Sequence, residues 1–215
     1  MKEKLKLYLV TDSDILKERD FYKCIEDALK GGVTTLQLRE KNVNGKEFLE
    51  KAYKLRELTK KYNVLFIIND RVDIAMLCDA DGVHVGQHDM EVGEVRQMLG
   101  KEKIIGVSAR TVEQAQRAQL RGADYLGVGA VFHTGTKEDA KKLDRRVLKS
   151  ITEAVDIPVI GIGGIQESNV LELSGNGLCG VAVVSAVFAQ ADIEEAARKL
   201  KILTEKMIKQ EISDL

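Results

Sequence analysis

Short apolar segments alternate with amphipathic segments along the whole chain. Eight apolar segments have the length of strands, and they cover residues 5–11, 33–38, 64–68, 82–85, 104–107, 125–128, 158–162 and 180–184. Between them, apolar residues return every three or four positions, which is the periodicity of an amphipathic helix. The predicted helices cover 21–30, 45–61, 92–99, 112–121, 145–155, 166–173 and 193–209, with a shorter helix-like segment at 72–77.

Eight strands that alternate with helices predict a (β/α)8 TIM barrel of the α/β class, formed by one domain over residues 1–215. A doubly wound open sheet has the same alternation. The eight repeats, and the lack of a G-x-G-x-x-G motif after the first strand, favour the barrel. Gly32, Gly122 and Gly177 precede predicted strands, where a helix ends most easily on a residue with positive φ.

The composition indicates a globular protein with no broad charged surface. Of 215 residues, 44% are hydrophobic and 31% charged, and the net charge is −1. We therefore expect no nucleic-acid partner and no membrane partner. The residues that follow the start of the chain resemble neither a signal peptide nor a spanning helix. The widely spaced Cys24, Cys78 and Cys179 are typical of buried thiols in a reducing compartment, so we expect a cytoplasmic protein.

A barrel carries its active site at the C-terminal ends of its strands. After the second strand, the period of two places Leu36 and Leu38 toward the helices. The same period places Gln37, Arg39 and Lys41 at the mouth of the barrel. Two cations beside an amide suit a highly anionic group, because Arg offers a planar fork of donors and Lys a point charge.

Two carboxylates follow neighbouring strands. Asp70 comes after the third strand and Asp89 after the fourth, and together they could hold a hard cation such as Mg²⁺. Asp70 could instead cap the helix-like segment 72–77. Ser108, at the end of the fifth strand, could donate to phosphate or cap the next helix.

Two further segments have the composition of phosphate-binding loops. Gly163 and Gly164 end the seventh strand, and Val184 and Ser185 end the eighth, where barrels bind phosphate through backbone N–H groups. Residues 130–141 combine hydroxyl groups, a glycine and a lysine: Thr134, Gly135, Thr136 and Lys137. The sequence therefore predicts small phosphorylated substrates, with one strongly cationic subsite and one lighter subsite built from backbone.

The three histidines have subordinate roles in this interpretation. His84 lies within a strand and is expected to be a packing residue, while His88 and His133 are expected to be exposed. The scattered aromatic residues are expected to belong to the core.

At these motifs the chain closely resembles the thiamine phosphate synthase family. The shared segments are 8–12 (YLVTD), 37–41 (QLREK), 68–73 (INDRVD), 82–87 with Asp89, 106–109 (GVSA), 127–137, 161–165 and 183–185. They occur in the family's order over nearly the whole chain.

The resemblance implies an enzyme that condenses 4-amino-2-methyl-5-(diphosphomethyl)pyrimidine with a thiazole phosphate, giving thiamine monophosphate and pyrophosphate. It implies that Mg²⁺ binds Asp70 and Asp89. The residues that it assigns to the pyrimidine diphosphate are Gln37, Leu38, Arg39, Glu40, Lys41, Asn69, Ser108 and Lys137. The residues that it assigns to the thiazole phosphate are Thr134, Thr136, Gly164, Val184 and Ser185. Among these, Arg39, Lys41, Lys137 and Ser108 would carry catalysis.

Two other functions remain as alternatives. A sister family of thiazole tautomerases uses the same barrel with a histidine in the sixth-strand segment, where this chain has Ala130. A non-catalytic sensor of phosphorylated ligands would bind without turnover. The sequence leaves open the oligomeric state, a homo-oligomer included, and whether the thiazole substrate is carboxylated.

Overall fold

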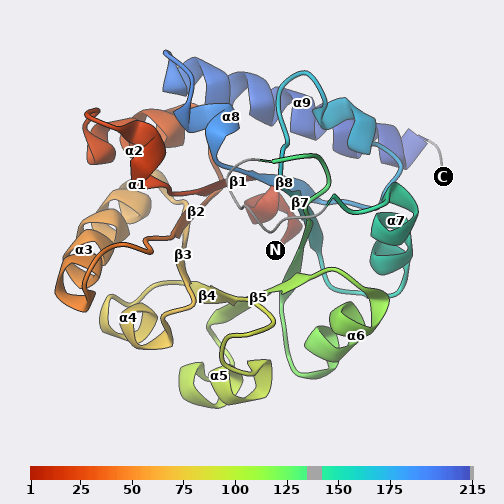
Figure 1. The fold of residues 1–215 in the computed structure, drawn as a ribbon, viewed down its shortest axis with the longest axis horizontal. Helices are drawn as coiled ribbons and strands as arrows, with labels where there is room; N and C mark the ends of the chain where they lie inside the picture. Colours follow the sequence, from red (N-terminus) through yellow and green to blue (C-terminus); the bar gives the residue numbers. More distant parts are fainter. Residues whose placement is uncertain (135–141, 214–215) are drawn as a thin grey trace.

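The fold is a closed parallel barrel surrounded by helices, as predicted (Figure 1). The computed structural model describes residues 1–134 and 142–213. Neighbouring strands pair in chain order, and the ring closes where Leu7, Tyr8 and Leu9 pair with Val181, Ala182 and Val183.

The strands are β1 (Leu7–Val10), β2 (Thr35–Leu38), β3 (Leu65–Asn69), β4 (Gly82–Val85), β5 (Ile104–Ala109), β6 (Tyr125–Gly129), β7 (Val159–Ile162) and β8 (Gly180–Val183). The α-helices are α1 (Ser13–Leu16), α2 (Phe21–Lys30), α3 (Gly45–Tyr62), α4 (Val72–Leu77), α5 (Val92–Leu99), α6 (Val112–Leu120), α7 (Arg145–Glu153), α8 (Ser185–Phe188) and α9 (Ile193–Ser213). Two 3-10 helices, η1 (Lys2–Leu5) and η2 (Val170–Leu173), complete the described elements.

The apolar side chains form two layers, because successive residues of a strand point to opposite faces. One layer fills the space between the barrel and the helices and includes Leu36 and Leu38, which confirms the orientation predicted for them. The other lies inside the barrel and includes Tyr8, Ile67 and Tyr125. The strand residues that point inward beyond this second layer are therefore the ones that can form a site at the C-terminal mouth.

The predicted start of the first strand is wrong by two residues. Leu5 belongs to η1 and not to a strand. Its side chain packs with Tyr8 and Cys179 in the layer inside the barrel. Figure 1 shows the N-terminus close to the centre of the ring of strands. Leu5 is apolar because it closes the N-terminal end of the barrel.

The helix predicted over 166–173 is also wrong, since only the 3-10 helix η2 forms there. The Asn169 side chain accepts a hydrogen bond from the Gln166 N–H at 2.8 Å and donates to the Gly164 carbonyl at 3.0 Å. An asparagine that bonds its neighbouring backbone competes with helical hydrogen bonds. The short helices α1 and α8 were not predicted, because four residues are too few to show helical periodicity.

The positive φ expected at three glycines and the burial expected of the cysteines are confirmed. Gly32, Gly122 and Gly177 have φ of +103°, +95° and +73° before their strands. The three cysteines are buried, and none of them forms a disulfide within the described residues. Of the helices in the described ranges, none is both long enough and apolar enough to span a membrane.

Candidate active site

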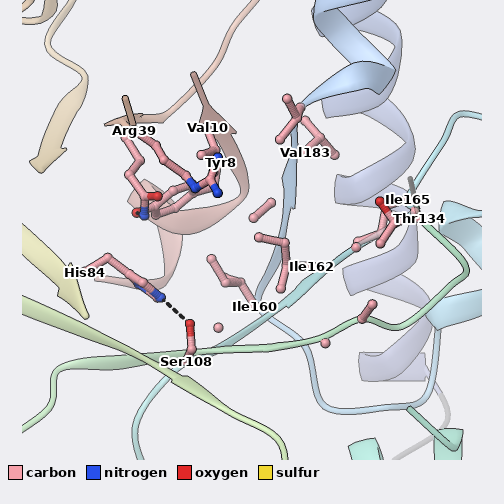
Figure 2. Close-up of a pocket in the computed structure, with 18 of the residues that line it drawn as sticks. Tyr8, Val10, Arg39, His84, Ser108, Thr134, Ile160, Ile162, Ile165 and Val183 are labelled. Carbon is pink, nitrogen blue, oxygen red and sulfur yellow. Dashed lines mark hydrogen bonds between the residues drawn. The ribbon is translucent and has the colours of Figure 1, made fainter. Parts of the chain in front are cut away.

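A cavity of about 210 Å³ opens at the C-terminal ends of the strands (Figure 2). Its lining brings together nine of the residues singled out in the sequence, namely Gln37, Arg39, Asn69, Ser108, Thr134, Gly163, Gly164, Val184 and Ser185. They come from β2, β3 and β5 and from the segments that follow β2, β6, β7 and β8. The barrel therefore assembles in space a group of residues that are far apart in the sequence.

Gln37 and Arg39 are held by neighbours from β1 and the residue that follows it. The Gln37 side chain is buried, and its Nε2 donates to the Tyr8 hydroxyl at 2.8 Å. The Thr11 hydroxyl accepts from the Arg39 N–H at 2.8 Å and donates to the Arg39 carbonyl at 3.0 Å. Thr11 thus fixes the backbone from which the Arg39 guanidinium extends along the cavity.

The residues next to Arg39 in the sequence lie outside the cavity lining. Leu38 packs between the barrel and the helices. The Glu40 carboxylate is only 4% exposed; it accepts from the Ser13 hydroxyl at 2.8 Å and pairs with the Lys51 ammonium at 2.8 Å. Lys41 is exposed. Within the predicted segment 37–41, the side chains of Gln37 and Arg39 are the ones in the cavity lining.

Asp70 and Asp89 form a carboxylate pair beside this cluster. The Asp70 N–H donates to the His84 carbonyl at 2.9 Å, which ties the end of β3 to β4. The Asp89 carboxylate accepts the Gly86 N–H at 2.7 Å. Burial raises the pKa of Asp70 to about 6, helped by the charge of Asp89 and a hydrogen bond between the two carboxyl groups. Asn69 and Lys41 oppose that rise.

The surroundings of this pair fit a divalent metal ion. Two adjacent carboxylates, one of them partly buried, carry a repulsion that a cation would relieve. Mg²⁺ in proteins often binds one or two carboxylates and completes its shell with substrate phosphates and water. In the described part of the chain, no group of three or more His, Cys, Asp or Glu side chains is placed to hold a metal. Asp70 does not act as a helix cap, since α4 begins after Arg71 without a side-chain cap.

The two glycines after β7 allow a close approach of the segment that follows β6. Gly163 and Gly164 have φ of +98° and +67°. A Cβ on Gly164 would lie 2.2 Å from the His133 carbonyl oxygen, and a Cβ on Gly163 2.5 Å from the Ala130 Cβ. Thr134 and Ser185 line the cavity and also an open groove beside it.

Three predicted residues, Gly135, Thr136 and Lys137, lie outside the described residues. The exposure expected for His88 and His133 is confirmed.

The sequence interpretation missed a hydrogen-bonded group inside the barrel. The Ser108 hydroxyl lies 2.9 Å from His84 Nε2 (Figure 2). His84 Nδ1 lies 3.0 Å from the Tyr125 hydroxyl. Both ring nitrogens of His84 are hydrogen-bonded, as expected of a satisfied packing residue, and His84 also lines the cavity. Ser108 does not cap α6, whose cap is Thr111. The period of two in β1 and β4 could have placed Tyr8 and His84 inside the barrel.

A parallel barrel with basic, carboxylate and glycine-rich groups at its C-terminal mouth has the organisation of a (β/α)8 enzyme. The family model described as Thiamine monophosphate synthase matches residues 7–187. A Clostridioides difficile protein named Thiamine-phosphate synthase is 58% identical over 199 residues, covering 93% of this chain and 95% of the relative. A protein of the same name from Alkaliphilus oremlandii is 54% identical over 91% of this chain and 93% of its own length.

A solved structure of a thiamine phosphate pyrophosphorylase from Pyrococcus furiosus superposes with a TM-score of 0.89 at 39% identity, covering 96% of this chain and 98% of that one. The chain therefore belongs to the thiamine monophosphate synthase family, and it is an enzyme of the thiamine-phosphate synthase type.

Proposed function

We propose that the chain condenses 4-amino-2-methyl-5-(diphosphomethyl)pyrimidine with 4-methyl-5-(2-phosphoethyl)thiazole to give thiamine monophosphate and pyrophosphate. If the thiazole is carboxylated, the same coupling also releases the carboxyl group as CO2. Family membership supports the reaction, and the relatives carry the corresponding name. The observation that carries the assignment within this chain is the Asp70–Asp89 carboxylate pair next to the basic residues that follow β2.

The diphosphate would bind where the carboxylate pair and the basic side chains meet. Arg39 would hold its oxygens through a planar fork, and Lys41 would add a charge from the exposed rim. Asp70 and Asp89 would bind Mg²⁺, which when bound neutralises charge on the diphosphate. Asn69 and Ser108 line the adjoining cavity and would donate to the same group. Lys137 belongs to this subsite by resemblance alone.

The thiazole phosphate would bind at the other glycine-rich side of the mouth. Gly164 leaves its N–H accessible because it carries no side chain, and Ser185 begins a helix in the cavity lining. Thr134 adds a hydroxyl, Val184 a backbone N–H, and Thr136 is assigned by resemblance. A subsite of neutral donors suits a monophosphate, whereas the carboxylate and basic cluster suits a diphosphate.

The proposed chemistry needs no general base. The C–O bond between the pyrimidinyl-methyl carbon and the diphosphate breaks, and both electrons leave with the pyrophosphate. The lone pair of the thiazole nitrogen then forms the new C–N bond to the methyl carbon. The enzyme's part is to stabilise the departing anion and to hold the two substrates in line.

Two other functions would leave different traces. A thiazole tautomerase would isomerise the thiazole without coupling it to the pyrimidine. A phosphate-ligand sensor would bind both ligands without turnover. The carboxylate pair favours the synthase over both, because neither function needs a metal site for a leaving diphosphate.

Substitution of the proposed metal ligand tests the assignment. We expect Asp89→Ala and Lys137→Ala each to lower turnover at least ~100-fold, as for loss of a preorganised charge-stabilising group. The matched controls are Asp156→Ala and Lys149→Ala, at exposed positions near the start of β7 and on α7. The measurement is the rate of thiamine monophosphate formation, detected as its fluorescent thiochrome. A near-normal rate in either active-site variant would remove the role assigned to that residue.

Three buried cysteines that form no disulfide within the described residues support a reducing environment. We therefore place the enzyme in the cytoplasm, acting on small phosphorylated molecules.

A further inference from the structure

Five polar side chains form a continuous chain across the inside of the barrel. Gln37 Nε2 lies 2.8 Å from the Tyr8 hydroxyl, which lies 2.8 Å from the Tyr125 hydroxyl. The Tyr125 hydroxyl lies 3.0 Å from His84 Nδ1, and His84 Nε2 lies 2.9 Å from the Ser108 hydroxyl. These residues come from β2, β1, β6, β4 and β5, so the chain links strands on different sides of the barrel.

Two glycines create the space for this chain. A Cβ on Gly106 would lie 2.1 Å from the Tyr125 ring, and a Cβ on Gly127 would lie 3.1 Å from His84 Cε1. Both glycines occupy inward-facing positions of β5 and β6, where a barrel ordinarily has bulky side chains. The lack of side chains at these two glycines therefore leaves room for the hydrogen-bonded side chains of Tyr125 and His84.

One end of the chain sets the direction of its hydrogen bonds. The amide nitrogen of Gln37 can only donate, so the Tyr8 oxygen accepts from it. Tyr8 and Tyr125 are 1% and 0% exposed, and a hydroxyl buried in this way needs an acceptor for its proton. Burial raises the pKa of both tyrosines, which keeps them protonated. The Tyr8 proton therefore points to Tyr125.

The direction of the Tyr8 proton fixes the direction of the remaining hydrogen bonds. The Tyr125 oxygen already accepts from Tyr8, so its own proton goes to His84 Nδ1. A neutral imidazole that accepts at Nδ1 carries its proton on Nε2. That nitrogen then donates to the Ser108 oxygen. The Ser108 proton is left to bond an acceptor on the cavity side.

We propose that this directed chain holds His84 as the Nε2–H tautomer and thereby orients Ser108 as a hydrogen-bond donor into the cavity. Figure 2 shows the His84–Ser108 bond at the cavity, near the apolar side chain of Ile160, which also lines the cavity. His84, Tyr125 and Tyr8 are positioning residues, and Ser108 is the group that contacts substrate. That Ser108 donates to the diphosphate rests on the proposed function, whereas the tautomer does not.

The tautomer is measured directly by nitrogen NMR of the full-length chain with labelled histidine. The sequence contains three histidines, so His84→Asn identifies the resonances of residue 84. We expect coupling patterns of a neutral ring protonated on Nε2. A ring protonated on Nδ1, an average of the two tautomers, or a doubly protonated ring at neutral pH would each overturn the proposal.

Removing one hydroxyl from the chain provides the second test. Tyr125→Phe keeps the ring that fills the interior but leaves His84 Nδ1 without its donor. We expect the His84 signals to shift to a mixture of tautomers and kcat to fall about tenfold, the effect of a misoriented bond to a charged group. KM for the pyrimidine diphosphate should change less than about twofold, because the interaction strengthens as charge develops.

Tyr62→Phe is the matched control, since the Tyr62 hydroxyl bonds Glu26 on the outer surface. It should leave kcat and the His84 signals unchanged. An unchanged tautomer and kcat in Tyr125→Phe would overturn the proposal, as would the same kinetic loss in Tyr62→Phe. If the wild-type protein made no thiamine monophosphate, the proposed function would fail. The tautomer measurement would still decide the direction of the hydrogen bonds from Gln37 to Ser108.

Discussion

Asp70 is the residue at which activity and stability most clearly conflict. Its pKa is raised to about 6, chiefly by burial and then by Asp89, so at neutral pH the folded protein holds an unfavourable negative charge there. Asp70 also has a positive φ of 60°, a conformation that Asn tolerates as well. The carboxylate that we propose as a cation ligand therefore weakens the metal-free fold.

We expect Asp70→Asn to stabilise the metal-free protein at pH 7 while it abolishes most of the activity. The unfolded chain has its ordinary pKa of 3.8, so above pH 6 both states are ionised and the folded state bears the full cost. As the pH falls from 6 to 4, the folded state takes up the proton first and the cost disappears. Discounted for solvent screening, the gain is about 1 kcal/mol at pH 7 and approaches zero near pH 4.

The measurement is thermal unfolding in EDTA at pH 7 and pH 4.5. Asp73→Asn is the control from the first turn of the adjacent helix α4, because the Arg71 guanidinium lowers the pKa of Asp73 and loss of this charge should slightly destabilise the fold. An Asp70→Asn variant less stable than wild type at pH 7 in EDTA would contradict the assigned repulsion.

Gly164 offers a second test at the scale of one residue. Gly164→Ala would place a Cβ 2.2 Å from the His133 carbonyl oxygen at a φ of +67°. Gly100→Ala is matched to it, because Gly100 has a φ of +73° with no atom within 4 Å of the added Cβ. We expect the control to lose about 2 kcal/mol from backbone strain alone, because φ of 73° with ψ of −172° is a region that essentially only glycine adopts. Gly164→Ala should lose more and bind the thiazole phosphate about tenfold more weakly, a change of about 1.4 kcal/mol.

Urea unfolding and calorimetric binding measure both effects. Equal stability losses in the two variants, with unchanged binding in Gly164→Ala, would mean that this glycine does not shape the phosphate subsite.

At the scale of elements, hydrophobic pattern predicted the strands and most helices, because parallel strands buried on both faces read as continuous apolar runs. The pattern could not separate Leu5 from the strand that follows it, because Leu5 is apolar as well. Leu5 lies in the 3-10 helix η1 and closes the end of the barrel. It also misjudged residues 166–173, where a single asparagine redirects the backbone hydrogen bonds. Hydrogen bonds between a side chain and the neighbouring backbone do not change the hydrophobic periodicity of a sequence.

Arg96 joins three elements outside the active site. Its guanidinium donates to the carbonyls of Lys103 and Gly122 at 2.6 and 2.8 Å and pairs with Asp124, linking α5 to the starts of β5 and β6. Because a lysine cannot replace this fork of donors, we expect Arg96→Lys to lower the free energy of unfolding by about 2 kcal/mol.

Chemical unfolding measures this loss of stability. We expect kcat per folded molecule to be unchanged in Arg96→Lys. Arg198→Lys is the control, because Arg198 makes exposed ion pairs with Glu194 and Glu195 on α9 and should cost less than about 0.5 kcal/mol. Equal effects of the two substitutions would show that Arg96 is an ordinary surface residue.

At the scale of the whole molecule, the closed barrel brings residues from distant parts of the sequence to one mouth. The sequence pattern predicted Gln37, Arg39 and Ser108 for that mouth, because each is a polar side chain at the end of a strand, and the family resemblance added Asn69. It did not predict the link from Tyr8 through Tyr125 to His84, because hydrogen bonds across the barrel depend on register and on the space left at Gly106 and Gly127. The sequence therefore indicates the polar residues at the strand ends better than the hydrogen bonds inside the barrel beneath them.

The most direct test of the account is product formation by the purified chain with both substrates, measured with Mg²⁺, with excess EDTA, and after Mg²⁺ is restored. The account predicts thiamine monophosphate and pyrophosphate in equal amounts, loss of both in EDTA, and recovery with the metal. Binding of both ligands without product, or a rate that EDTA leaves unchanged, would contradict it.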